Sequence, residues 1–292
     1  MILFDSHTHL TDEQYEGEKD KIVENARNNN VMYMIDVGYN EQTSKEAIQD
    51  ALKYEGVYAT VGLHPENIDE NEGSLEFVEK YCINDKVVAI GEVGLDYHYG
   101  GNKELQKEIF IKQIEIANKN KLPVVIHSRD ADMDMLSILK EHKIENKFVM
   151  HCFSSSVEVL KEMIKLDAYI SLAGPVTFKN ARSLIDVAKL IPENRLMVET
   201  DAPYLAPEPN RGKRNESAYV AYTAQKIADL RECSLEELSE ITTENAKRFY
   251  NIKWGERNGK KDNVNRASTY RSNNSRKLHW SNKTNGWIPR KI

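Results

Sequence analysis

Residues 4–10 read Phe-Asp-Ser-His-Thr-His-Leu and directly follow the apolar residues that open the chain. His7 and His9 are two positions apart, and in an extended strand such residues point to the same face. Their rings can therefore converge on one metal ion at about 2.0–2.1 Å per nitrogen. Two polar residues where a strand turns outward would give the same pattern, so a metal site requires further ligands elsewhere in the chain.

Short apolar runs rich in β-branched residues recur through the first 200 residues, with room between them for one helix and two loops. The runs are continuous rather than alternating, which is typical of parallel strands buried on both faces. The predicted strands are 2–4, 31–37, 57–61, 87–90, 124–126, 148–150, 168–172 and 196–198.

The intervening segments have the three- and four-residue apolar spacing of amphipathic helices. Thr11 with Gln14, and Ser234 with Glu237, have the spacing of capping boxes ahead of two of them. Eight alternations of strand and helix predict a (β/α)8 TIM barrel with right-handed crossovers. A doubly wound open sheet is the alternative, but no Gly-rich phosphate loop follows the first strand. The predicted helices are 13–29, 41–54, 74–81, 103–120, 131–143, 157–166, 181–190, 217–230 and 235–250.

Charge divides the 292 residues into two parts. Residues 253–292 carry eleven Lys and Arg against two acidic residues, a net charge of +9, which leaves −15 for residues 1–252 out of a total of −6. The basic part is polar and lacks periodicity, so we expect one barrel domain over 1–252 and a disordered tail over 253–292. A basic arm that binds nucleic acid is the alternative for the tail. The acidic body must hold any anionic substrate by local positive charge.

The location of the protein is predicted from what the chain lacks. Cys82, Cys152 and Cys233 are scattered and odd in number, which favours a reducing compartment over a disulfide framework. No run approaches 18 apolar residues, and the N-terminus lacks the basic region of a secretion signal. We therefore expect a cytoplasmic protein without membrane association, and no obligate protein partner is evident.

Further residues of metal-binding type follow the predicted strands. In a barrel the C-terminal ends of the strands form one rim, so these side chains would meet His7 and His9. Six protein ligands are too many for one tetrahedral ion and suit two divalent ions about 3.5–4 Å apart. The further candidates are Glu92, His127, His151 and Asp201.

The order of the strands suggests how these ligands are shared. Glu92 is the better candidate for a bridging carboxylate, because its strand lies between the two ligand groups. His7, His9 and Asp201 would then complete one site, and His127 and His151 the other. Four neutral imidazoles and two carboxylates leave a formal charge of +2 with two divalent ions, which favours an anionic substrate and a metal-bound hydroxide.

Several residues near the rim are candidates for catalysis and substrate binding. Asp201 could orient or deprotonate the attacking water, and His64 could bind a phosphate or move a proton, with a role in capping its loop as the alternative. Asp5, on the same strand face as His7, is a candidate either for a partner of a ligand imidazole or for a buried structural residue. Arginines near the rim suit phosphate oxygens because their guanidinium groups are forked. These phosphate candidates are Arg129, Arg211 and Arg214, with Lys213 in the same loop as the last two.

The motifs together resemble the TatD-type metal-dependent DNase family, a branch of the amidohydrolase-like barrel superfamily. They occur in family order within residues 1–252 and depart from the family pattern at Ser155 and Ser217, where Gly and Pro are usual. The motifs are Phe4-Asp-Ser-His-Thr-His-Leu10, Gly62-Leu-His-Pro65, Gly91-Glu-Val-Gly-Leu-Asp-Tyr97, His127-Ser-Arg-Asp130, His151-Cys-Phe-Ser154, Glu199-Thr-Asp-Ala-Pro-Tyr-Leu205 and Arg211-Gly-Lys-Arg-Asn-Glu216.

The resemblance implies hydrolysis of phosphodiester bonds in DNA by a barrel with divalent metals, often as a 3′→5′ exonuclease. It supports the same six metal ligands, with Asp201 and Glu92 at the centre of the chemistry. Mg, Mn and Zn are all candidates for the two ions. Hydrolysis of an ester or amide, such as a lactone or an aminoacyl linkage on RNA, is the alternative enzyme activity, because the same metal pair activates water for either reaction. A non-catalytic nucleic-acid binder acting through the tail is a third hypothesis.

Overall fold

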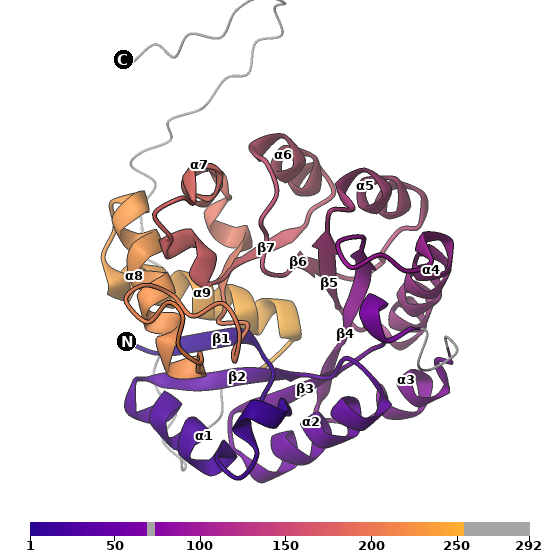
Figure 1. Ribbon diagram of the computed structural model, residues 1–292, viewed down its shortest axis with the longest axis horizontal. Helices are drawn as coiled ribbons and strands as arrows, with labels where there is room; N and C mark the ends of the chain where they lie inside the picture. The colour runs from indigo at the N-terminus through magenta and orange to yellow at the C-terminus, as the bar shows by residue number, and fades with distance from the viewer. Residues whose placement is uncertain (69–73, 254–292) are drawn as a thin grey trace, which may run out of the picture. The chain divides into compact units, whose positions relative to one another are not determined.

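The computed structural model describes residues 1–68 and 74–253. Within them, eight parallel strands are hydrogen-bonded in sequence order, from β1 to β8 (Figure 1). This order excludes the doubly wound sheet, in which the strand order reverses about a switch point. The strands are β1 Leu3–Thr8, β2 Val31–Val37, β3 Val57–Val61, β4 Val87–Asp96, β5 Val124–Arg129, β6 Phe148–Met150, β7 Tyr169–Leu172 and β8 Leu196–Val198.

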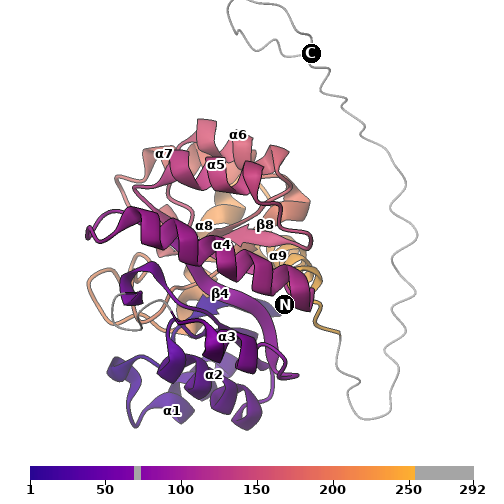
Figure 2. The same cartoon turned by 90° about the vertical axis from the view of Figure 1, so that its right-hand side faces the viewer.

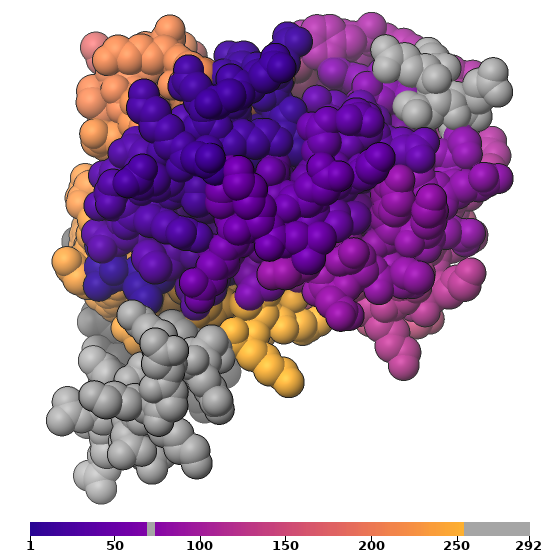
Figure 3. All heavy atoms as spheres, turned by 90° about the horizontal axis from the view of Figure 1, so that it is seen from below, coloured from indigo at the N-terminus to yellow at the C-terminus, as the bar shows by residue number. Residues whose placement is uncertain are grey.

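The helices lie outside the strands, as α4 does against β4 (Figure 2). From the side that α1 and α2 cover, the helices and loops form a continuous surface (Figure 3). The fold is therefore the predicted (β/α)8 barrel. The helices are α1 Lys19–Asn28, α2 Glu41–Lys53, α3 Glu76–Tyr81, α4 Lys103–Asn120, α5 Asp132–Glu141, α6 Val157–Lys165, α7 Arg182–Leu190, α8 Val220–Arg231 and α9 Leu235–Tyr250.

The sheet closes between β1 and the segment that follows β8. The His7 carbonyl accepts a hydrogen bond from the Asp201 N–H at 3.0 Å, and the His9 N–H donates to the Ala202 carbonyl at 2.8 Å. Thr8 and Ala202 form a parallel bridge. Closure therefore occurs at the rim, and it brings the first predicted ligands to the last one.

Two hydrophobic layers explain why the site lies at one end of the barrel. The larger cluster fills the space between strands and helices. A smaller cluster combines inward-facing strand residues such as Phe4 and Met197 with Phe249 and Tyr250 of α9. The Tyr250 hydroxyl donates to the Ser6 carbonyl at 2.9 Å. These α9 side chains close the end of the barrel opposite the C-terminal rim with apolar groups. Polar residues can therefore gather only at the C-terminal rim.

Two local predictions are wrong, and both concern the start of the chain. The helix predicted over 13–29 is split into a 3-10 turn, Glu13–Tyr15, and α1, with Gly17 at φ +74° between them. The cap of the turn is Asp12, whose carboxylate accepts from the Gln14 N–H at 2.9 Å, rather than Thr11. The carboxylate of Asp12 reaches the N–H groups of the turn, so the Thr hydroxyl is not needed there. The Ser234 cap of α9 is confirmed, because the Glu237 N–H donates to the Ser234 hydroxyl at 3.1 Å.

Other expectations concern disulfides, membranes and the tail. All three cysteines are free. None of the helices within 1–68 and 74–253 has the length and hydropathy needed to cross a bilayer. The predicted tail beyond residue 253 lies outside the described residues, so its disorder and the domain boundary stay predictions.

Gly94 provides a test of the contact between β4 and β5. Its φ is +144°, and a Cβ there would lie 2.0 Å from the His127 carbonyl oxygen. We expect Gly94→Ala to lower the free energy of unfolding by about 3 kcal/mol or more, because strain and overpacking add. Gly17→Ala is the matched control, since φ is +74° with nothing within 4 Å of the added Cβ, and it should cost only about 1 kcal/mol. Thermal melts followed by circular dichroism measure both, and equal losses would contradict the close contact.

Candidate metal centre

All six predicted ligands meet at the rim, and His64 joins them. Among the described residues, three overlapping groups have ligand atoms that all lie within 4.8 Å of one another. The shared members, His7 and Glu92, link the groups into one continuous cluster. The groups are His7, His9 and Asp201; His7, Glu92 and His151; and His64, Glu92 and His127.

The first group combines His7 of β1 and His9, which directly follows β1, with the carboxylate that follows β8. The Nε2 atoms of His7 and His9 are 3.3 Å apart. Asp201 Oδ1 lies 3.3 Å from His9 Nε2 and 3.7 Å from His7 Nε2. Asp201 has a left-handed φ of +56°, which costs about 1–3 kcal/mol for a residue other than glycine. The surrounding hydrogen bonds therefore hold a strained backbone in order to aim this carboxylate inward.

Glu92 stands between the two ligand groups. Its Oε2 lies 3.4 Å from His7 Nε2 and 3.7 Å from His9 Nε2. Its Oε1 lies 2.9 Å from His127 Nδ1 and 2.7 Å from His151 Nε2. Each oxygen thus faces a different pair of imidazoles, which is the geometry of a bridging carboxylate.

The spacing of these atoms suits metal ions. Two ligand atoms about 2.1 Å from one tetrahedral ion are about 3.4 Å apart, and the distances within the first group are 3.3–3.7 Å. The electrostatics also favour cations. Burial alone would raise the pKa of Glu92, but the adjacent imidazoles hold it well below its usual range. Burial opposes the charged form of His9, yet the hydrogen bond with Asp201 and the charge of Glu92 raise its pKa to about 9. The buried carboxylates therefore favour positive charge between them.

Hydrogen-bond partners of the opposite ring nitrogens orient His9 and His127, and a carboxylate lies close to that nitrogen of His151. His9 Nδ1 lies 3.3 Å from the Val37 carbonyl. His127 Nε2 lies 2.9 Å from Asp96 Oδ2, and His151 Nδ1 lies 3.3 Å from Glu199 Oε1. Because these oxygens accept, the neutral His9 and His127 rings carry their proton on the outer nitrogen and turn a lone pair toward the cluster, whereas His151 Nδ1 lies near Glu199 without forming a hydrogen bond.

His64 has the opposite arrangement. Its Nδ1 accepts a hydrogen bond from the Glu66 N–H at 3.2 Å, and burial lowers its pKa. In the neutral ring the proton is therefore on Nε2, which lies 3.5 Å from Glu92 Oε1. His64 thus points a donor, not a lone pair, into the cluster.

The three predicted phosphate-binding arginines have different surroundings. Arg129 is exposed and its guanidinium lies 5.0 Å from the centre of the Tyr99 ring. Arg211 is exposed and lies 4.2 Å from the centre of the Phe178 ring. Arg214 instead pairs with Glu18 at 2.6 Å and donates to the Gln14 carbonyl. Arg129 and Arg211 are therefore free of carboxylate pairs in the described residues, whereas Arg214 is tied to the start of α1.

Relatives of the chain identify its family. A family profile described as "TatD related DNase" matches residues 4–251. The chain belongs to the TatD family. It is 46% identical over 254 residues to the metal-dependent hydrolase YabD of Bacillus subtilis, covering 86% of this chain and 100% of YabD. It is 37% identical to the metal-dependent hydrolase YcfH of Escherichia coli K12, covering 86% of this chain and 97% of YcfH.

Solved structures of TatD proteins share the barrel. The crystal structure of YJJV, a TatD homologue from Escherichia coli K12, has a TM-score of 0.81 and 26% identity over 86% of this chain and 98% of YJJV. A TatD-family hydrolase from Entamoeba histolytica has a TM-score of 0.75 and 26% identity, with 85% of this chain and 98% of that one covered. This TatD-family chain is therefore a metal-dependent hydrolase.

Sequence reasoning missed Asp96 and Glu199, the carboxylates behind His127 and His151. Asp96 is four residues after Glu92 in one strand, and Glu199 is two residues before Asp201, so even spacing could have placed each on the ligand face. With these two carboxylates included, the formal charge with two divalent ions is zero rather than +2. Asp5, in contrast, accepts from the N–H and hydroxyl of Thr200 at 2.8 and 2.6 Å, so it supports the segment that carries Asp201 rather than an imidazole.

We expect Asp96→Asn to lower the affinity for divalent metal about 10–100-fold. An amide N–H facing His127 Nε2 would shift the ring proton to Nδ1, the atom that faces Glu92, and so remove the lone pair. Asp134→Asn is the matched control, because that carboxylate pairs with Lys107 at 2.8 Å on the surface. Titration of metal against a competing chelator measures both variants. Equal affinities in the wild type and Asp96→Asn would contradict the orienting role of Asp96.

Proposed function

We propose that this TatD-family hydrolase cleaves phosphodiester bonds in DNA with two divalent metal ions, as a 3′→5′ exodeoxyribonuclease. The observation that carries the proposal is the position of Glu92, whose two oxygens face separate pairs of imidazoles. Such a shared carboxylate suits a pair of ions, and paired ions are common in enzymes that cleave phosphodiesters. The family description as related to DNases supports DNA as the substrate.

The distances support a division of the ligands into two sets that share Glu92. His7, His9 and Asp201 would hold one ion, His127 and His151 the other, and Glu92 would contact both. When bound, such ions polarise a phosphoryl oxygen and lower the pKa of water. The sites fit Mn, Zn or Mg, since imidazole suits the first two and carboxylates all three.

Asp201 is the proposed general base. Burial would raise its pKa, but the hydrogen bond with His9 and the nearby imidazoles hold it below the usual range, so the carboxylate is ionised. Its side chain keeps 13% exposure, more than Glu92 at 6%. A water that attacks phosphorus from the open side of the rim can therefore pass its proton to Asp201.

His64 is the proposed donor to the substrate. Its Nε2–H points into the cluster from the side of β3, next to Glu92. From there it can donate a hydrogen bond to a phosphoryl oxygen as negative charge develops on that oxygen. Glu92 would keep the donor oriented until the substrate enters.

The exposed arginines are the proposed ligands for the substrate phosphates that are not being cleaved. Arg129 at the end of β5 and Arg211 in the loop after β8 lie at the rim without carboxylate pairs in the described part of the chain. Their charge would offset the acidic body, whose net charge repels DNA. We further propose a reducing, cytoplasmic setting, which the three unpaired cysteines support.

The first test of the function is degradation of single-stranded DNA. We expect turnover only with added Mg²⁺, Mn²⁺ or Zn²⁺, and its loss after treatment with a chelator. Asp201→Asn should lower kcat at least about 100-fold because it removes the base, and asparagine tolerates the positive φ at this position. Intact DNA under all metals, together with cleavage of a lactone or ester panel, would favour the alternative hydrolase activity.

The second test concerns His64. We expect His64→Gln to lower kcat about 10–100-fold on the same substrate, because a donor to the transition state is displaced. Metal content should stay equal to that of the wild type, since His64 presents a proton rather than a lone pair to the cluster. His142→Gln, at the end of α5, is the control and should leave both quantities unchanged. A loss of bound metal in His64→Gln would instead make His64 a ligand.

A further inference from the structure

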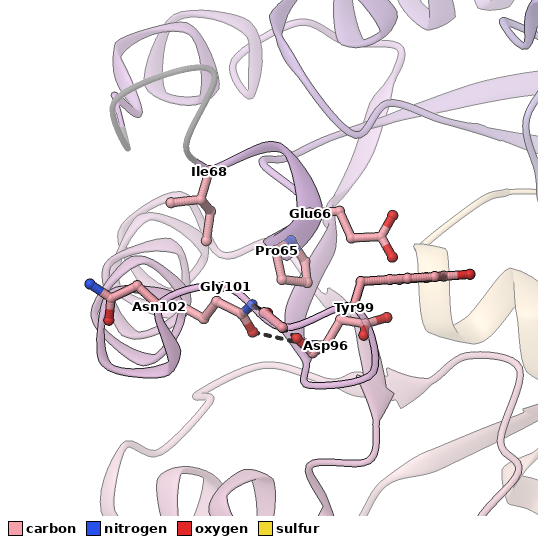
Figure 4. Close-up of a pocket in the computed structure, with 9 residues that line it drawn as sticks. Pro65, Glu66, Ile68, Asp96, Tyr99, Gly101 and Asn102 are labelled. Atoms are coloured by element: carbon pink, nitrogen blue, oxygen red, sulfur yellow. Dashed lines mark hydrogen bonds between the residues drawn. The ribbon is translucent and has the colours of Figure 1, made fainter.

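A cavity of about 400 Å³ lies beside the metal centre, at the C-terminal end of β4 (Figure 4). Its walls come from the loop after β3, the loop after β4 and the start of α4. Pro65 and Ile68 line it on one side, and Tyr99 and Gly101 line it from the loop after β4. The volume falls in the range of small-molecule sites, about 300–1,000 Å³.

Two residues that line the cavity are directly connected to residues of the metal centre. Pro65 directly follows His64, whose Nε2 lies 3.5 Å from Glu92 Oε1. Asp96 lines the cavity and also holds His127 at 2.9 Å. A substrate whose phosphate reaches the cluster therefore brings its neighbouring chemical group to the cavity.

Tyr99 presents an aromatic ring to this space. The side chain is 70% exposed, although a large aromatic residue usually gains by burial. The Arg129 guanidinium lies 5.0 Å from its ring centre, and the His98 ring meets it edge-on at 4.9 Å. Arg129 does not line the cavity, and Figure 4 shows the Tyr99 ring edge-on beneath the Glu66 carboxylate, extending away from Pro65 and Ile68. Arg129 and His98 thus restrain a ring that is open to the cavity.

The charges around the cavity determine what can enter it. Glu66 and Asp96 are its only charged lining residues in the described chain, and both are acidic. A phosphate would be repelled, whereas a neutral planar group can stack on the Tyr99 ring and contact the apolar side chains of Pro65 and Ile68. In a nucleic acid, the neutral planar group next to a phosphodiester is the base.

We propose that this cavity binds the nucleobase adjacent to the scissile phosphodiester, with Tyr99 as its stacking platform. The inference rests on the proposed nuclease function and adds a base-binding subsite to it. Stacking does not depend on the hydrogen-bonding groups of the base, so the subsite accepts any of the four bases. It therefore favours single-stranded substrate, in which a base can leave its neighbours to enter the cavity.

The test compares two substrates that have the same phosphates. One is a single-stranded oligodeoxynucleotide, and the other is the same backbone with every residue abasic. We expect Tyr99→Ala to raise KM about tenfold for the first substrate, or about 1.4 kcal/mol, with kcat and the KM for the abasic substrate unchanged. Tyr99→Phe keeps the ring and should match the wild type. Tyr222→Ala, on α8 across the barrel from α4 (Figure 1), removes another exposed tyrosine and should change neither KM.

The outcomes separate the subsite from the function itself. If the wild type cleaves both substrates with equal KM, or if Tyr99→Ala raises both values alike, the base subsite is overturned while the nuclease function stands. If the wild type cleaves neither substrate under any metal, the nuclease function and the subsite fall together. Because Arg129 would contact phosphates present in both substrates, displacement of Arg129 cannot imitate the expected difference.

Discussion

The hydrogen bonds between β1 and the segment after β8 are the constraint on which the rest of the site depends. The His7 carbonyl and the Asp201 N–H are 194 residues apart in the chain, yet they pair at 3.0 Å. Asp5 adds two bonds to Thr200 at 2.8 and 2.6 Å. Without this closure His7 and His9 would lack their carboxylate neighbour, because Asp201 takes its left-handed conformation only where neighbouring bonds enforce it.

Buried negative charge gives the closed rim its chemistry. Glu92 and Asp201 remain ionised among imidazoles even though burial opposes their charge. Charges removed from water must be compensated nearby, by protons or by metal ions. The family's dependence on metal and the spacing of the candidate ligand atoms both favour compensation by metal ions. Asp96 and Glu199, which lie behind His127 and His151, add further negative charge, so in the proposed function local arginines rather than a surplus of metal charge would attract the anionic substrate.

Much of this arrangement is readable from local patterns. The eight strands and the helices between them follow from apolar periodicity, which depends only on near neighbours in the chain. Once a barrel is assumed, His7, His9, Glu92, His127 and the other ligands follow from one rule, that strand ends share a rim. The errors lie where short-range alternatives compete, as at Asp12 and Thr11, two adjacent capping side chains of which only one reaches the N–H groups of the turn.

The sequence by itself therefore determined the barrel and the candidate ligand residues that meet at its rim, because both depend on periods of two and of about 3.6 residues. Only the tertiary structure decided which groups meet across the chain. It set Asp96 against His127, placed the proton of His64 on Nε2, paired Arg214 with Glu18, and left the Tyr99 ring open beside the centre. Such contacts join residues on different loops, and no local pattern records the direction of a side chain once the strand that carries it has ended.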